Sequence, residues 1–170
     1  MAHHFKFNAT IHGVTIEKFR ELVSDISLHE RICHKIPGEN LVITESKLVG
    51  QQYTLRREYN LAVNIPDVAK KILKDAFRLT RSDITQLDQL TSDVELGANL
   101  PLKAKAKRYV TGGTNQVNVE IDWEVKVSIP LIGGFLEKHA EGEIRRFSDI
   151  EINIINEEIQ QILATENAAS

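Results

Sequence analysis

Two arginines and an aspartate stand at positions where the sequence is otherwise apolar. Arg57 follows the alternation that puts Tyr59 on the inward face of its segment, and Arg81 and Asp83 share a face with Leu79. A buried charge without a partner is costly, so such groups pair with each other, reach solvent or line a wet cavity. An arginine and a carboxylate in one cavity can hold the polar head of a ligand whose apolar body fills the remaining space.

A further carboxylate of this kind lies near the end of the chain. Glu151 falls on the apolar stripe of a long helical segment, so we expect it to meet Arg57 or Arg81 across the cavity. The predicted polar part of the pocket is therefore Arg57, Arg81, Asp83 and Glu151. The alternative is that these side chains extend to the rim or form structural ion pairs without a ligand.

Other groups capable of acid–base or metal chemistry are scattered. His139 falls at the edge of the helical stripe, where it either contacts a ligand at the cavity mouth or lies on the rim. His29 and His34 lie on different sides of a predicted helix, so we expect neither a metal site nor a cofactor. Cys33 is the only cysteine, which excludes an intramolecular disulfide, and the sequence identifies no catalytic residue.

Hydrophobic periodicity predicts the elements that position these residues. Trp123 opens an alternating strand that Pro130 ends, because proline cannot sit inside a strand ladder. Gly133 and Gly134 then let a helix begin close to the sheet or to a ligand. One apolar stripe of this helix carries Ile132, Leu136, Ala140, Ile144, Phe147, Ile150, Ile154, Ile155 and Ile162.

The chain before this helix supplies a sheet for it to cover. Two short helices open at Thr15 and Ser27, directly after the first strand. The predicted strands are His4–Ile11, Leu41–Val49, Gln52–Val63, Leu79–Leu87, Asp93–Ala98, Leu102–Val110 and Gln116–Ile129. Short turns between these strands favour an antiparallel meander of about seven strands, so the fold class is α+β.

The space between sheet and helix is the predicted binding cavity. Ala104 and Ala106 have inward parity, and their small side chains leave volume that the helix does not fill. The segment Ile65–Phe77 breaks the strand rhythm and is a candidate lid. The predicted ligand-binding residues are Arg57, Tyr59, Arg81, Asp83, Ala104, Ala106, Trp123, Phe135, His139, Phe147 and Glu151.

Composition restricts the class of protein. The chain has 170 residues, 42% hydrophobic and 26% charged, which is ordinary for one globular domain spanning residues 1–170. The formal net charge of −3 argues against a nucleic-acid partner, and the basic run at 103–108 fits the solvent face of a strand. No signal peptide or membrane-spanning run is evident, so we expect a cytoplasmic protein whose membrane contact is at most transient.

The run at 123–137, WEVKVSIPLIGGFLE, together with the order of elements, resembles the START-like superfamily. This group is also called the polyketide cyclase, SRPBCC or helix-grip group. The run is more closely similar to that of a small bacterial START-like family of unassigned function, which also has an Arg-Arg pair like Arg145 and Arg146. The resemblance implies a curved antiparallel sheet gripping a C-terminal helix, with an apolar cavity between them that holds lipids, sterols, quinones or polyketides.

The resemblance does not imply one activity, since members include carriers, cyclases, hydroxylase subunits and chaperone activators. The leading hypothesis is binding or carriage of a hydrophobic, lipid-like small molecule. One alternative is a cyclase- or hydrolase-type enzyme that uses dispersed groups such as Asp83, Glu151 or His139. Another is a module whose groove accepts a protein partner. The oligomeric state is not evident from the sequence.

Overall fold

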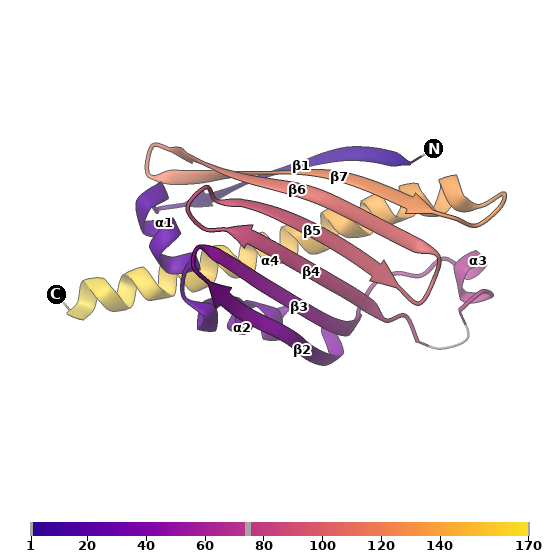
Figure 1. The fold of residues 1–170 in the computed structure, drawn as a ribbon, viewed down its shortest axis with the longest axis horizontal. Helices are drawn as coiled ribbons and strands as arrows, with labels where there is room; N and C mark the ends of the chain where they lie inside the picture. Colours follow the sequence, from indigo (N-terminus) through magenta and orange to yellow (C-terminus); the bar gives the residue numbers. More distant parts are fainter. Residues whose placement is uncertain (1, 74–75, 170) are drawn as a thin grey trace.

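Seven antiparallel strands form one sheet, and the long C-terminal helix lies across one of its faces (Figure 1). The structure is a computed structural model that describes residues 2–73 and 76–169. Its elements are β1 (His3–His12), α1 (Ile16–Val23), α2 (Ile26–Lys35), β2 (Gly38–Val49), β3 (Gln52–Leu61), α3 (Asp67–Lys70), β4 (Leu79–Gln86), β5 (Thr91–Ala98), β6 (Leu102–Gly113), β7 (Gln116–Val127) and α4 (Gly133–Ala169). The predicted α+β helix-grip architecture is confirmed.

The strand order is β1-β7-β6-β5-β4-β3-β2, so the first strand pairs with the last. Every other pair joins two strands that are consecutive in sequence, as expected for a meander with short connections. The turn between β6 and β7 is shorter than predicted, because β6 extends through both glycines to Gly113. Asn115 then takes a positive φ of 52°, a conformation that asparagine tolerates in tight turns.

Local capping sets the start of both short helices. The Thr15 hydroxyl accepts a hydrogen bond from the Lys18 backbone N–H at 3.2 Å, which caps α1. The Asp25 carboxylate accepts one from the Ser27 N–H at 3.0 Å and caps α2. The second helix therefore begins at Ile26, before the predicted start at Ser27, because the aspartate is the cap.

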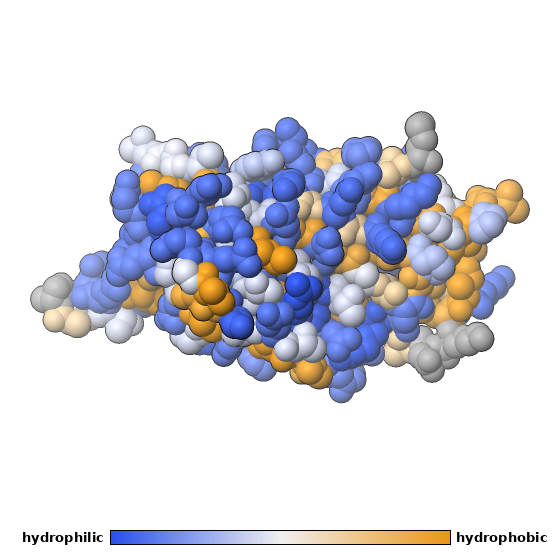
Figure 2. Space-filling view, viewed as in Figure 1, coloured by the Kyte–Doolittle hydropathy of each residue, from blue (hydrophilic) through white to orange (hydrophobic). Residues whose placement is uncertain are grey.

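The core lies between the sheet and the three longer helices. β7 contributes a row of buried residues with strict alternation, and these are Val117, Val119, Ile121, Trp123, Val125 and Val127. On the outer face, Lys103, Lys105 and Lys107 are exposed, as predicted for the basic run of β6. Figure 2 shows this outer face as mostly hydrophilic, with hydrophobic residues gathered at the end where α3 lies.

The apolar stripe of α4 is wider than predicted toward its C-terminus. Ile159 is fully buried although the predicted stripe omits it, whereas Ile150 is only partly buried and is not part of the core. The reason is that α2 also packs on α4. The buried Glu158 carboxylate of α4 pairs with Lys35 at 2.5 Å and with Arg31 at 3.4 Å, both from α2. This half of α4 is thus covered by helices as well as by strands.

The segment predicted as a lid contains the single short helix α3. Ala69 of α3 is 2% exposed and packs with Val127 of β7 and Leu136 of α4. Residues 74 and 75 of the predicted lid lie outside the described residues. The lid itself stays a prediction, but α3 is anchored to the end of the sheet and to the first turns of α4.

Candidate ligand-binding site

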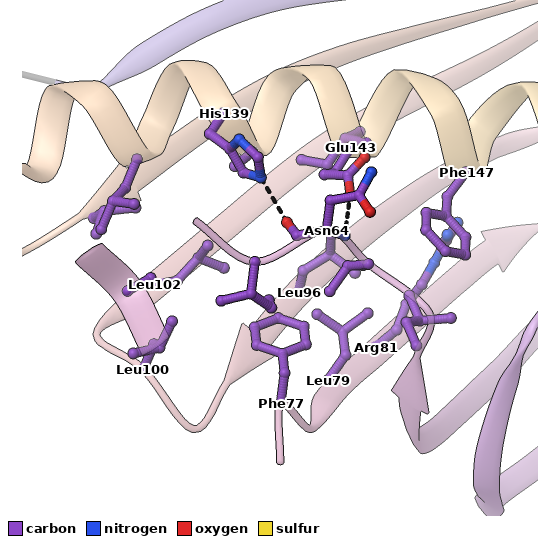
Figure 3. A pocket seen from close by; sticks show the side chains of 18 of the residues that line it. Asn64, Phe77, Leu79, Arg81, Leu96, Leu100, Leu102, His139, Glu143 and Phe147 are labelled. Carbon is purple, nitrogen blue, oxygen red and sulfur yellow. Dashed lines mark hydrogen bonds between the residues drawn. The ribbon is translucent and has the colours of Figure 1, made fainter. Parts of the chain in front are cut away.

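A cavity of about 120 Å³ lies between the sheet, the β3–α3 loop and α4. We call it the main cavity. Its walls are mostly apolar, with a few polar groups from α4 and β4 (Figure 3). They include Ile36, Tyr59, Leu61, Ile65, Ala69, Phe77, Leu79, Leu96, Leu102, Trp123, Leu136, Ala140, Ile144 and Phe147, together with Asn64, Arg81, His139, Glu143 and Glu151.

At one side of the main cavity, two residues of α4 hold the loop that follows β3 (Figure 3). His139 Nε2 donates to the Asn64 carbonyl oxygen at 2.6 Å, and the Glu143 carboxylate accepts from the Asn64 backbone N–H. Arg146 binds Glu143 at 2.8 Å and donates to the Ala62 carbonyl oxygen at 3.1 Å. Because residues four apart on a helix share a face, His139 and Glu143 contact the same peptide segment.

At the other side, three arginines and two carboxylates form one network that is buried at Arg57 and Asp83 and partly buried elsewhere. We call it the ionic cluster, and it comprises Arg57, Arg81, Asp83, Arg108 and Glu151. Asp83 accepts four hydrogen bonds, one each from Arg57 at 2.8 Å and Arg108 at 3.1 Å and two from Arg81 at 2.8 and 3.1 Å. Arg81 also donates to Glu151 at 3.3 Å, which is the contact expected between α4 and the sheet.

The electrostatics of the ionic cluster keep Asp83 ionised. Burial alone would raise the pKa of the Asp83 carboxyl, but Arg81, Arg57 and Arg108 outweigh burial and hold that pKa well below its usual value of 3.8. A carboxylate whose folded-state pKa is depressed stabilises the fold fully above its unfolded-state pKa. That contribution is lost as the pH falls through the folded-state value.

This linkage gives a prediction for acid conditions. The ¹³C chemical shift of the Asp83 carboxylate should keep its ionised value when the pH falls through roughly 4, where a solvated aspartate takes up its proton. The free energy of unfolding should decline below that pH, because the unfolded chain then binds a proton that the folded chain refuses. An Asp83 resonance that titrates near 4 would contradict the paired, buried carboxylate. The readout is carboxyl-detected NMR beside urea unfolding at the same pH values.

Six of the predicted ligand-binding residues line the main cavity, namely Tyr59, Arg81, Trp123, His139, Phe147 and Glu151. Arg57 and Asp83 lie behind Arg81 in the ionic cluster and are 3% and 6% exposed. Of the four charged residues of the predicted polar end, Arg57 and Asp83 are therefore buried, and Arg81 and Glu151 are partly buried. Their role in binding a ligand stays a prediction.

Three further placements differ from the expectation. Phe135 is 59% exposed and does not line the main cavity, because its neighbour Leu136 occupies the inward position of the first turn of α4. Ala104 and Ala106 are buried in the core but do not line the main cavity either. Ala106 pairs with Trp123 across the strands, so the large indole takes the volume beside the small methyl group.

Trp123 has an unmet hydrogen-bonding need. Its side chain is 3% exposed and lines the main cavity, stacked on Phe5 with ring centroids 6.4 Å apart. In the described part of the chain, its Nε1–H finds no acceptor. A buried indole N–H usually has a partner, so this enclosed donor is a polar group without compensation in the described part of the fold.

The comparison with known families follows from this geometry. Residues 6–159 match the model of a family described as "Protein of unknown function (DUF2505)". The chain belongs to this family. No curated protein sequence gives a significant match to the chain.

Solved structures place this DUF2505 chain in the START-like, helix-grip fold. It is similar to the Zhui aromatase/cyclase from Streptomyces sp. R1128, with a TM-score of 0.64 and 11% identity over 96% of each chain. A START superfamily protein from Mycobacterium smegmatis gives 0.58 and 15% identity over 94% of this chain and 99% of that one. Norcoclaurine synthase from Thalictrum flavum gives 0.62 and 12% over 94% and 87%. At these identities the likeness shows the fold alone.

Two features are absent from the described part of this DUF2505 chain. Among residues 2–73 and 76–169, no three His, Cys, Asp or Glu side chains gather where they could hold a metal ion. Over the same residues, no helix is long and apolar enough to cross a membrane.

Sequence reasoning missed Arg108, which it grouped with the basic run on the solvent face. Arg108 has the parity of Ala104 and Ala106, so strict alternation would have turned it inward. Its guanidinium reaches Asp83, and it also donates to the hydroxyl of Ser92 at 2.8 Å. Asn64 gave no signal in the sequence, because its role depends on backbone atoms in a loop.

Proposed function

We propose that the chain, as one domain, binds a hydrophobic, lipid-like small molecule in the main cavity. The observation that carries this proposal is a mostly apolar cavity between the sheet and α4 that is lined by only a few polar side chains. An engineered cavity of about 150 Å³ with similar lining binds benzene, so the enclosed part of the ligand is about that size. The enclosed part of the ligand is a short apolar body.

Binding would be driven by removal of apolar surface from water. At roughly 25 cal/mol per Å², a six-carbon chain contributes about 5 kcal/mol before the cost of ordering. Without that cost, 5 kcal/mol corresponds to a dissociation constant of roughly 0.2 mM, so we expect simple probes of this size to bind with dissociation constants of about 1 mM or weaker.

The geometry supports binding over acid–base catalysis. Two of the fold relatives bear the names of enzymes, an aromatase/cyclase and norcoclaurine synthase. In this chain, however, Asp83 is held by three guanidinium groups, Glu151 by Arg81, and His139 by a backbone carbonyl oxygen. A general base needs a free lone pair within reach of its substrate, and the four hydrogen bonds to Asp83 leave that carboxylate none.

The proposal also includes transient contact with a membrane. Ile72, Leu131 and Phe135 are exposed, and Leu131 takes a positive φ of 72° while fully exposed. They lie at the end of the molecule that carries α3 and the β7–α4 corner, close to residues that line the main cavity. Exposed apolar side chains beside a cavity can exchange a ligand with a lipid surface. We place this exchange in the cytoplasm, where the lone thiol of Cys33 stays reduced.

Filling the main cavity should abolish binding. Ala140 lines the cavity from α4, so Ala140→Phe places a ring inside it. In a titration with neutral alcohols from butanol to decanol, we expect the affinity of the variant to fall about tenfold or more, because the introduced ring occupies the volume that the alkyl chain of the alcohol would fill. Trp123 is the only tryptophan and lines the cavity, so its fluorescence reports occupancy directly.

The matched control is Ala164→Phe, which adds the same ring at an exposed position of the same helix. It should bind the alcohols as the unchanged chain does. If no alcohol shifts the Trp123 emission, or if Ala140→Phe binds normally while folded, the proposal is wrong. Native mass spectrometry after mild extraction would identify the physiological ligand.

A further inference from the structure

A second cavity, of about 100 Å³, lies between α1, α2 and the inner face of the sheet. We call it the arginine cavity. It shares only Ile36 and Glu151 with the main cavity, so its other walls are its own. These walls are largely apolar, with Phe19, Val23, Leu28, Ile32, Leu55, Leu90, Val110, Val119 and Ile155 among them.

Its polar lining is predominantly cationic. Arg57, Arg108 and Glu151 line it, together with Thr85 of β4 and Ser92 of β5, whose hydroxyls lie 2.8 Å apart. The two other ionisable groups of the lining are uncharged at neutral pH. Burial lowers the pKa of His29, whose Nε2–H donates to the Val23 carbonyl oxygen at 2.6 Å, and burial raises the pKa of the Cys33 thiol.

The ionic cluster as a whole carries one positive charge in excess, with three guanidinium groups against two carboxylates. The four hydrogen bonds to Asp83 occupy the lone-pair sites that a carboxylate offers, two on each oxygen. Arg57 is 3% exposed, and its Nε–H finds no acceptor among the described residues. A buried charged donor without a partner is costly, so the folded chain holds an unmet demand for a negative acceptor.

We propose that the arginine cavity binds the carboxylate of a small apolar acid, with Arg57 and Arg108 as its cationic partners. One carboxylate balances the single excess charge, and its planar oxygens suit the guanidinium fork. A phosphate dianion would bring two negative charges against that single excess positive charge. The apolar walls around Leu28, Ile32 and Leu55 then take the body of the acid. This site is separate from the one proposed in the main cavity and does not depend on it.

The test compares benzoate with benzamide, which share a shape and differ in charge. By isothermal titration at neutral pH, benzoate should bind about tenfold or more tightly than benzamide, because a hydrogen bond to a charged group is worth that much. In Arg57→Met this preference should vanish. Arg56→Met is the matched control, since Arg56 is the exposed neighbour in the same strand, and it should keep the preference.

Removal of Arg57 leaves two arginines against two carboxylates, so the variant should fold. If it does not, Arg108→Met tests the same charge at a position whose side chain is 21% exposed. Glu151→Gln should strengthen the preference, because it increases the excess of positive charge. Ala140→Phe, which fills the main cavity, should leave benzoate binding unchanged and so separates the two sites. An equal affinity for benzoate and benzamide in the unchanged chain, or a preference that survives Arg57→Met, overturns the proposal.

Discussion

Asp83→Asn should destabilise the protein by about 3–5 kcal/mol, the cost typical of breaking a buried ion pair from one side. The change removes the negative charge that faces Arg57, Arg81 and Arg108 and replaces one of the two accepting oxygens, each of which accepts two hydrogen bonds, by an NH2 donor. For a chain of this length, we expect the melting temperature to fall by about 10 °C or more. Urea unfolding followed by circular dichroism measures the loss.

The control is Asp88→Asn, the same substitution in the exposed turn between β4 and β5, which should change stability by less than about 0.5 kcal/mol. The double variant Arg57→Met with Asp83→Asn should be more stable than Asp83→Asn alone, because it withdraws one of the unpaired charges. Additive losses in the double variant would show that the two residues do not act as a pair.

Among substitutions that add a single methyl group at the start of α4, Gly133→Ala should lower the stability of the protein most. A Cβ at Gly133 would lie 2.5 Å from the Val127 carbonyl oxygen, closer than real contacts allow. Val127 cannot easily yield, because its N–H donates to the buried Glu137 carboxylate at 2.9 Å. We expect a loss of about 1–3 kcal/mol, as for other overpacked sites. Weaker binding of the alcohol probes should accompany it, since Val127 lines the main cavity.

Gly134→Ala provides the comparison within the same motif. A Cβ at Gly134 meets nothing within 4 Å, so the variant should be neutral or gain up to about 1 kcal/mol from helix propensity. Thermal unfolding of the two variants under the same conditions measures the difference in their stability. Equal stabilities would mean that the close approach at Gly133 is relieved by movement of the whole helix.

Periodicity was sufficient to predict the sheet, the long helix and the inward parity of Arg57, Arg81 and Asp83. Parity works because successive side chains of a strand alternate between faces, whatever their chemistry. The contact between Arg81 and Glu151 was also predictable, since a charge on the apolar stripe of a helix needs a partner on the surface that the helix covers.

What periodicity could not give were features that depend on three-dimensional packing. The exposure of Phe135 follows from how the first turn of α4 is rotated, which Gly133 and its contact with β7 set. The filling of the space beside Ala106 follows from its register with Trp123. The second cavity, under α1 and α2, depends on how closely these two short helices pack on the sheet. No sequence pattern encodes the distance between a helix and the sheet.

The pairing of β1 with β7 also affects how the protein is made. Every other strand pairs with a strand that is adjacent in sequence, so β2 to β7 can assemble in order as the ribosome releases them. β1 leaves the ribosome first, yet His3 pairs with Val125 and His12 with Gln116. Such long-range closure slows folding. Phe5 and Phe7 therefore have no strand partner until most of the chain has been synthesised. The core is complete only when α4 packs against β1 and β7.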